Sequence, residues 1–414
     1  MTDLDRGTDD PFEHPAALAG PPIGWPGLRR LLVVRPDNLG DVLLAGPALA
    51  ALRAAAPDAR IHLLASPGGA AAASLLPEVD DVVVARVSWQ RIAPAPGPPD
   101  PGLADELAAR RYDAAVVLTS FSQSPWPAGY VCQLAGIPVR AGTSKEFGGA
   151  ALTHWVPAPH DDLHQVDRAL HVLDRLGVPP GEATLHAHVA PAAREAAERA
   201  LRATGGDPGR PHAVLLPGAS CPSRRYPPAG FRAAVRELTG AGLPVAVCGS
   251  GSERDLVHEV ADGIPGAVAL AGELDVPGLA ALLGGAAVVV ANNSGGMHLA
   301  DAVGTPVVVL FAGTELVEQY RPRSVPARVL GMPTACTPCR QFTCRYQHEC
   351  LDVDPAEIAR AALDLRGRAG SRGPGGVPGS AASRRPRLRH LLVRLRLERV
   401  RQHVVRDALG LRPQ

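Results

Sequence analysis

Residues 292–298 (Asn-Asn-Ser-Gly-Gly-Met-His) form a small, polar segment with the composition of an anion-binding site. They follow the apolar run 286–291 and precede a helix-like stretch, so unpaired backbone N–H groups and the helix dipole would favour a phosphate here. Two adjacent glycines would let the backbone approach such a ligand closely. An ordinary helix N-cap beside a glycine turn is the alternative. The residues predicted to bind the anion are Asn293, Ser294, Gly295, Gly296 and His298.

A single carboxylate, Asp41, ends the turn Asn-Leu-Gly-Asp that follows the apolar run 31–34. Gly40 allows a tight turn from strand to helix, which would place Asp41 at a helix start above the sheet. A carboxylate in that position could act as a general base. Its alternative role is that of an N-cap.

A second loop of small residues, 217–223, follows the strand-like run 212–216 and leads into Arg224 and Arg225. Backbone N–H groups of such a loop could cradle a diphosphate while a guanidinium group neutralises its charge. A solvated basic loop is the alternative. The later motif 249–253 (Gly-Ser-Gly-Ser-Glu) is weak, because it lacks the full dinucleotide fingerprint. The residues of the first loop predicted to bind the ligand are Gly218, Ser220 and Arg224.

Four of the seven cysteines lie within 15 residues, with His348 among them. Four thiolates could hold a structural zinc ion tetrahedrally. An iron–sulfur cluster, reduced thiols and a disulfide are the alternatives. The predicted metal ligands are Cys336, Cys339, Cys344 and Cys350, whereas Cys132, Cys221 and Cys248 have the surroundings of ordinary core or loop residues.

Short apolar runs alternate with helix-like stretches twice along the chain, which predicts two parallel α/β sheets. Ligands bind such sheets beyond the carboxyl ends of the strands, where the motifs above lie. The fold class expected is therefore α/β, with two Rossmann-like domains that face each other across a cleft. The expected strands cover 31–34, 61–65, 82–85 and 114–118 in the first half, and 212–216, 245–248, 268–270, 286–291 and 307–311 in the second.

Composition shifts along the chain mark the domain boundaries. The tail 384–414 is rich in arginine and has apolar residues near helical spacing, so it could lie on an anionic membrane. A solvated appendage and a helix docked on a partner are the alternatives. The expected parts are a disordered segment 1–28, an N-terminal domain 29–190, a partly helical linker 191–211, a C-terminal domain 211–350, a helix 351–366, and a flexible linker with the basic tail, 367–414.

The overall composition is that of a globular protein without an affinity for nucleic acid. The chain has 414 residues, 46% of them hydrophobic and 20% charged, and a net charge of +1. The acidic N-terminus lacks the apolar core of a signal peptide, and no run approaches the ~18–20 apolar residues of a membrane span. We therefore expect a cytoplasmic protein, peripheral at the inner face of the membrane if the tail binds there. Lys145 is the only lysine, so arginines stand where relatives use lysine.

Taken in order, the motifs Asn38–Leu44, Pro217–Pro227 and Asn293–Ala300 resemble glycosyltransferase family 9, typified by ADP-heptose:lipopolysaccharide heptosyltransferases. The resemblance covers roughly residues 30–365. It implies a GT-B fold and inverting transfer from a nucleotide-diphosphate sugar, ADP-heptose, to a glycan or glycolipid acceptor. It also implies that catalysis needs no metal or other cofactor.

By the same resemblance, Asp41 is the catalytic base and Arg224 takes the place of the family's phosphate-binding lysine. Residues 293–298 match the stretch at the donor diphosphate, and Glu253 matches an acidic residue near the nucleoside. Asn293 replaces the usual aspartate, which removes a charge near the diphosphate. A nucleotide-sugar-binding protein without turnover is therefore one alternative, against which the retained Asp41 argues. A Rossmann-type dehydrogenase is another, against which the incomplete glycine fingerprint argues.

Overall fold

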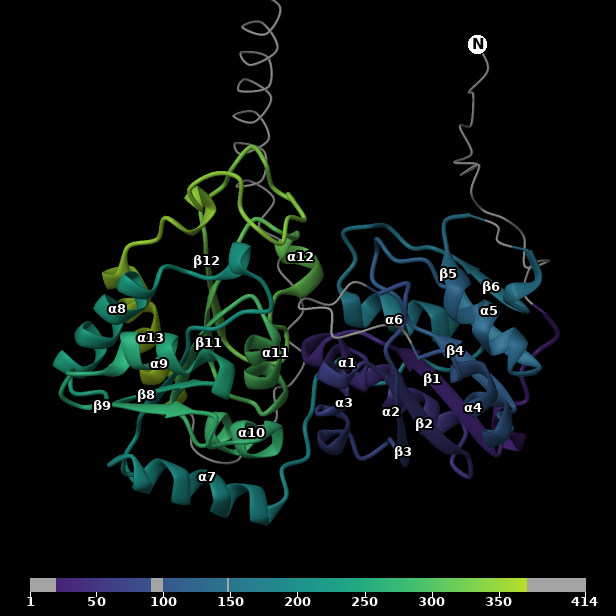
Figure 1. Ribbon diagram of the computed structural model, residues 1–414, viewed down its shortest axis with the longest axis horizontal. Helices are drawn as coiled ribbons and strands as arrows, with labels where there is room; N and C mark the ends of the chain where they lie inside the picture. The colour runs from purple at the N-terminus through teal and green to yellow at the C-terminus, as the bar shows by residue number, and fades with distance from the viewer. Residues whose placement is uncertain (1–19, 91–99, 147–148, 371–414) are drawn as a thin grey trace, which may run out of the picture. The chain divides into compact units, whose positions relative to one another are not determined.

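The computed structural model describes residues 20–90, 100–146 and 149–370, which contain two six-stranded sheets (Figure 1). All strands of the N-terminal sheet pair in parallel, in the order β3-β2-β1-β4-β5-β6. Its register is set by the central strand, where Val33 pairs with Leu63 on one side and Val116 on the other. The strands are β1 (Arg30–Arg35), β2 (Arg60–Ala65), β3 (Asp81–Val84), β4 (Ala114–Val117), β5 (Val139–Ser144) and β6 (His154–Pro157).

The C-terminal sheet repeats this topology. Its strands are also parallel, in the order β12-β11-β10-β7-β8-β9, and Val290 of β10 pairs with Leu215 and Val308. The two halves are therefore two Rossmann-like α/β domains, as predicted. The strands are β7 (Ala213–Leu216), β8 (Val245–Gly249), β9 (Ala267–Ala271), β10 (Val288–Asn292), β11 (Val307–Leu310) and β12 (Ala327–Leu330).

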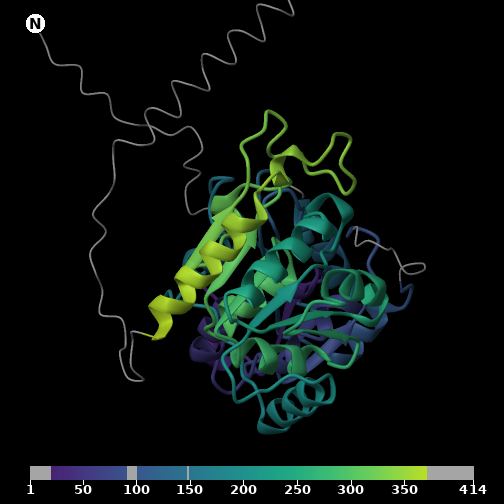
Figure 2. The same ribbon diagram turned by 90° about the vertical axis from the view of Figure 1, so that its left-hand side faces the viewer.

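Helices connect the strands and cover both faces of each sheet, because parallel neighbours need crossover connections. Figure 2 shows α13 lying along the C-terminal domain, whose core it joins. The N-terminal helices are α1 (Leu39–Leu44), α2 (Gly46–Ala55), α3 (Pro67–Ala70), α4 (Leu103–Arg110), α5 (Trp126–Leu134) and α6 (Gln165–Arg175). The others are α7 (Pro191–Ala203), α8 (Pro228–Gly240), α9 (Arg254–Ala261), α10 (Val276–Gly284), α11 (Gly295–Ala302), α12 (Val317–Tyr320) and α13 (Pro355–Gly370).

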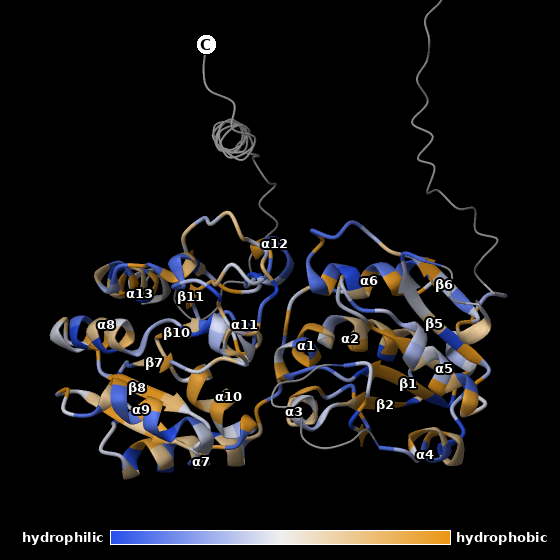
Figure 3. Cartoon of the chain, turned by 45° about the horizontal axis from the view of Figure 1, so that its top comes forward, coloured by the Kyte–Doolittle hydropathy of each residue, from blue (hydrophilic) through white to orange (hydrophobic). Residues whose placement is uncertain are grey.

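The strands consist largely of hydrophobic residues (orange in Figure 3). Their side chains form the core on both faces of the sheet. In β1, Leu31 and Val33 join one buried cluster, while Leu32 and Val34 join another on the opposite face. Each such side chain contributes ~1.5–3 kcal/mol when fully buried. This explains why the strands are continuous apolar runs rather than alternating ones, and why they could be located from the sequence.

Several boundaries differ from the expectation. Residues 20–28 were expected to be disordered, but Trp25 is buried and its indole Nε1 donates to the Leu176 carbonyl at 3.1 Å. The C-terminal helix runs to Gly370, beyond the predicted end at 366. The basic tail 384–414 lies outside the described residues, so its membrane contact stays a prediction. Among the described residues, no helix combines the length and the apolar composition needed to cross a bilayer.

Candidate active site

Both sheets reverse their strand order at the centre, between β1 and β4 and between β7 and β10. Loops that leave neighbouring strands in opposite directions at such a point open a crevice for ligands. A cleft of about 880 Å³ is lined by loops from both domains. The lining includes every residue that the sequence assigned to catalysis or donor binding: Asp41, Gly218, Ser220, Arg224, Glu253, Asn293, Ser294, Gly295, Gly296 and His298.

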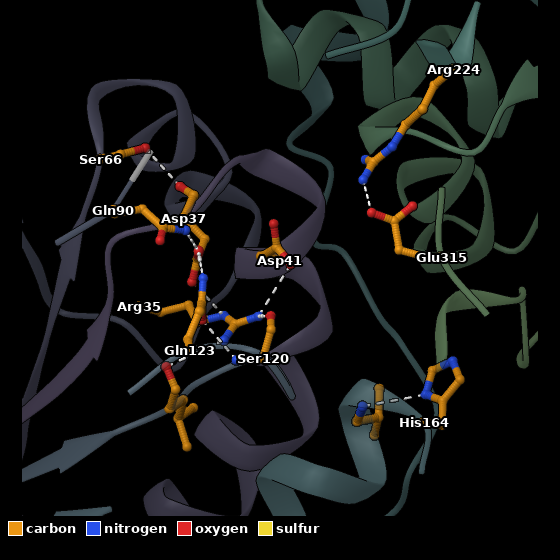
Figure 4. Close-up of polar contacts among 12 residues, drawn as sticks. Arg35, Asp37, Asp41, Ser66, Gln90, Ser120, Gln123, His164, Arg224 and Glu315 are labelled. Carbon is orange, nitrogen blue, oxygen red and sulfur yellow. Dashed lines mark hydrogen bonds and ion pairs between the residues drawn. The ribbon is translucent and has the colours of Figure 1, made fainter. Parts of the chain in front are cut away.

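Asp41 lies in the first turn of α1, with Asn38 as the N-cap residue. The N-cap role weighed for Asp41 is therefore wrong. Its carboxylate is partly exposed to the cleft, and Oδ1 accepts a hydrogen bond from Arg35 Nη2 at 3.1 Å (Figure 4). Within the described residues, Oδ2 has no hydrogen-bond donor. Arg35 therefore fixes one carboxylate oxygen of Asp41, and the other oxygen can form a hydrogen bond with a substrate in the cleft.

The glycines Gly40, Gly295 and Gly296 allow close packing of α11 against α1 and β7. A Cβ on Gly40 would lie 2.7 Å from His298 Cδ2, and one on Gly295 would lie 3.1 Å from Leu39 Cδ2. A Cβ on Gly296 would lie 2.3 Å from Leu216 Cδ1. The prediction attributed Gly295 and Gly296 to close approach by a ligand, whereas the structure shows that neighbouring protein atoms already require them.

His298 is buried in the first two turns of α11, against Gly40. Burial, with smaller effects of His164 and Arg224, lowers the pKa of His298 to about 3. The ring is therefore neutral near pH 7, and it lines the cleft as an uncharged hydrogen-bonding group rather than as a cation.

The predicted anion loops meet each other across β7 and β10. The Ser220 backbone N–H donates to Ser294 Oγ at 3.3 Å. Asn293 is buried, and its Oδ1 accepts from the Ala312 backbone N–H at 3.0 Å. The amide of Asn293 thus holds the end of β11 in place, a structural task that needs an oxygen acceptor and no charge.

Arg224 ends the 3-10 helix η5 (Pro222–Arg224) and points into the cleft (Figure 4). Its Nε donates to Thr314 Oγ1 at 3.1 Å, and its Nη2 forms an ion pair with Glu315. Burial alone would lower the pKa of Arg224, but Glu315 raises it, so the group stays charged. Arg225 is exposed and does not line the cleft, although it donates to the carbonyl of Ala219, a lining residue, at 3.2 Å.

Thr314 and Glu315 were missed by the sequence reasoning. They lie in the loop after β11, which ends at Leu310, and the carboxyl end of a parallel strand was the signal that could have pointed to them. Glu253, which was predicted, lines the cleft beside Gly218. Its Oε2 also accepts from the Ser250 backbone N–H at 2.9 Å, which closes a capping box.

Among the described residues, the cysteine loop, residues 331–350, is not arranged as a metal site, so the predicted zinc ion stays a prediction. Zinc needs four ligands that converge to about 2.0–2.3 Å from one point. Among the residues that the structure describes, no group of three or more His, Cys, Asp or Glu side chains is arranged to hold a metal ion. The thiols of Cys336, Cys339, Cys344 and Cys350 are free and partly buried, while those of Cys132, Cys221 and Cys248 are buried, as expected.

The cysteine loop instead contributes to the cleft. Arg340, Gln341 and Phe342 line it, and the Arg340 guanidinium lies 4.2 Å from the ring centre of Phe121 in the N-terminal domain. A cation stacked on an aromatic ring at this distance is a favourable contact. This contribution had no signal in the sequence beyond the cysteine spacing.

Two Rossmann-like domains with a cleft at their switch points are the architecture of the GT-B fold, which many glycosyltransferases share. The chain belongs to glycosyltransferase family 9, because the model of that family, described as "Glycosyltransferase family 9 (heptosyltransferase)", matches residues 102–349. The protein is thus a glycosyltransferase.

Individual relatives agree with this assignment. Lipopolysaccharide heptosyltransferase 1 of Pseudomonas aeruginosa is 32% identical over 39% of this chain and 43% of its own length. Lipopolysaccharide heptosyltransferase 3 of Escherichia coli is 28% identical over 67% of this chain and 81% of its own length. The structure of the E. coli ADP-heptose LPS heptosyltransferase II is similar, with a TM-score of 0.66 at 22% identity, covering 83% of this chain and 100% of that one. The last comparison confirms the GT-B fold.

Proposed function

We propose that this glycosyltransferase moves a heptose from ADP-heptose to a glycan or glycolipid acceptor of the lipopolysaccharide type, with inversion at the anomeric carbon. The observation that carries the proposal is the shared cleft. It brings one carboxylate, Asp41, and one cation with an anion-binding loop, Arg224 and residues 293–296, into the same space from different domains. The names of the relatives supply the sugar and the acceptor class.

The reaction needs a base on one side of the sugar and a site for the leaving group on the other. Oδ2 of Asp41 takes the proton of the acceptor hydroxyl as the hydroxyl oxygen bonds to the anomeric carbon. The bond from that carbon to the diphosphate oxygen breaks, and the electron pair leaves with the nucleoside diphosphate. Because attack and departure occur on opposite faces, the configuration inverts.

The charge that develops on the diphosphate is stabilised by the C-terminal domain. Arg224 supplies a cation, and the start of α11 supplies backbone N–H groups at Gly295 and Gly296. These groups carry the role that a metal ion has in other transferases. Glu315 pairs with Nη2 of Arg224 in the structure, so we expect the diphosphate to compete with that carboxylate when the donor binds.

A donor screen tests the proposal. Thermal unfolding is followed with ADP-heptose and with ADP-, GDP-, UDP- and TDP-hexoses, and ADP-heptose is expected to raise Tm by ~5 °C at saturation, more than the others. Release of ADP on addition of a lipopolysaccharide core acceptor then shows transfer. A preference for another nucleotide would refute the donor assignment.

The remaining alternative is a nucleotide-sugar-binding protein with little turnover, suggested by Asn293. Stabilisation by ADP-heptose without release of ADP would favour that alternative. Asn293 bonds to the Ala312 backbone in the structure, so its neutral side chain has a structural use that does not depend on lost catalysis.

A further inference from the structure

Arg35, the last residue of β1, is buried at 3% exposure and lies directly behind Asp41. Its guanidinium reaches four acceptors (Figure 4). Nη2 donates to Asp41 Oδ1 at 3.1 Å and to Ser120 Oγ at 2.9 Å. Nη1 donates to the Leu118 carbonyl at 3.2 Å, and Nε pairs with Asp37 Oδ2 at 3.1 Å. Contacts on all three nitrogens fix the plane of the guanidinium and therefore the direction from which it holds Asp41.

Asp37 is a second carboxylate, but it cannot reach a substrate in the way that Asp41 can. It is 2% exposed, and Oδ1 accepts from Gln123 Nε2 at 2.7 Å and from Gln90 Nε2, while Oδ2 faces Arg35. Both oxygens are thus engaged within the protein. The side chain of Asp41, by contrast, is 23% exposed.

Arg35 lies between the carboxylates of Asp37 and Asp41, and the charges of the three groups suggest why a base would have a second carboxylate nearby. A lone guanidinium beside Asp41 would favour its ionised form and so make it a weaker base. Asp37 offsets that charge, because it contacts the same guanidinium at the same distance of 3.1 Å as Asp41 does. The three groups together carry a net charge of −1.

We propose that Arg35 is a positioning residue that orients Asp41 for proton abstraction, and that Asp37 limits how strongly the charge of Arg35 acts on Asp41. This inference rests on the proposed role of Asp41 as the base. It goes beyond that role, since it assigns a function to a buried cation and to a buried carboxylate whose two oxygens are both bonded within the protein.

Electrostatics around the three groups agree with the assignment. Burial raises the pKa of Asp37 to about 6, in spite of the opposing effect of Arg35. Asp37 is therefore ionised near pH 7.5 and loses its charge when the pH falls below about 6. The other charged or titratable groups that act on Arg35 or Asp41 are Tyr320 of α12, Arg224 of η5 and Arg168 of α6.

The test measures ADP release from ADP-heptose in the presence of a lipopolysaccharide core acceptor. It is followed as a function of pH in Arg35→Met, Asp37→Asn and the double variant. Arg35→Met is expected to lower kcat ~10–100-fold with donor KM unchanged, and to move the acid limb of kcat to higher pH. Arg35→Lys should recover part of the loss. Asp37→Asn is expected to move the acid limb to lower pH and to lower kcat ~3–10-fold at pH 7.5. The double variant should keep the low kcat but return the limb toward the wild-type position.

Ser120→Ala is the matched control, because it removes a contact of Arg35 without changing charge. Its acid limb should stay in place. If Arg35→Met and Asp37→Asn lower activity without moving the limb in opposite directions, both residues are merely structural and the inference is overturned. Thermal unfolding shows whether each variant folds, and the double variant avoids a lone buried charge if a single one does not. Near-normal turnover of Asp41→Asn would instead overturn the proposed function.

Discussion

The two halves of the cleft differ in how deeply each buries its arginine, although both guanidinium groups have protein partners on all three nitrogens. In the N-terminal half, the side chain of Arg35 is 4% exposed and holds Asp41 as one of four protein acceptors. In the C-terminal half, the side chain of Arg224 is 25% exposed and is paired with Glu315, which also lines the cleft. A base needs one orientation throughout the reaction, whereas a donor site must bind and release a charged ligand in every cycle. We therefore expect arginine to serve as a fixed support in one half and as an exchangeable contact in the other.

The largest effect on activity should come from Asp41, in the N-terminal half of the cleft. Asp41→Asn is expected to lower turnover by ~100-fold or more, because general-base catalysis contributes at least that much. Nucleoside-diphosphate affinity should change little, since Asp41 belongs to the other domain. Steady-state ADP release and calorimetric titration with ADP measure the two quantities. Turnover within a few-fold of wild type would remove Asp41 from the base position.

Arg224→Ala should weaken binding of ADP by ~1.5–3 kcal/mol, the scale of a charge-assisted hydrogen bond. Arg224→Lys should recover part of this, because the charge survives and only the planar fork is lost. Arg225→Ala is the control, since Arg225 is exposed and bonds to the Ala219 carbonyl. Calorimetry gives all three values. A larger loss with Arg225→Ala than with Arg224→Ala would show that the wrong arginine was chosen.

His298 should make stability fall as the pH is lowered. Its pKa is about 3 in the folded protein and 6.5 as an ordinary value, so unfolding takes up a proton between these limits. The neutral His298 ring therefore contributes fully to the free energy of unfolding above pH 6.5. Below that pH the contribution falls by about 1.4 kcal/mol per pH unit. His298→Gln should therefore lose ~2 kcal/mol less than wild type between pH 7.5 and 5.0 in urea unfolding.

The matched control for that comparison is His160→Gln, which removes an exposed imidazole instead of a buried one. Parallel curves for wild type and His298→Gln would mean that His298 is not buried in neutral form.

The smallest effect should come from Glu315. Glu315→Gln removes the carboxylate that competes with the diphosphate for Arg224, so ADP should bind ~2–5-fold more tightly, the scale of a partly exposed ion pair. In an Arg224→Ala background the same change should have no effect. Weaker ADP binding in Glu315→Gln would show instead that the carboxylate helps to form the site.

The sequence was sufficient for the parts of the fold that rest on long apolar runs. Strands such as β1 and β10 are buried on both faces, so their positions could be predicted closely. No strand or helix was predicted from the sequence in the region 119–190, although this region contains β5, β6, α5 and α6. β5 reads Val-Arg-Ala-Gly-Thr-Ser, and its Arg140 is buried because three of the carbonyls it meets, those of Ile137, Ala150 and Ala151, accept from its guanidinium. Because arginine is charged, Arg140 interrupts the apolar pattern from which a buried strand is predicted.

For the candidate site, the residues that could be predicted are those in short motifs directly after strands, such as Asp41 and Arg224. The supporting contacts could not be predicted, because they join residues far apart in the chain. Gln123 bonds to Asp37 across 86 positions, and Glu315 pairs with Arg224 across 91. Only the packing of β1 against β4, and of β11 beside β10, brings these groups together.

The anomeric configuration of the transferred sugar tests the central claim most directly, which is that a base in one domain and a diphosphate site in the other act on opposite faces of the sugar. NMR spectra of the product and of the donor give the coupling constants at the anomeric carbon. The account predicts opposite configurations in donor and product. Retention would contradict it, because a single displacement in which attack and departure occur on opposite faces cannot give the same configuration.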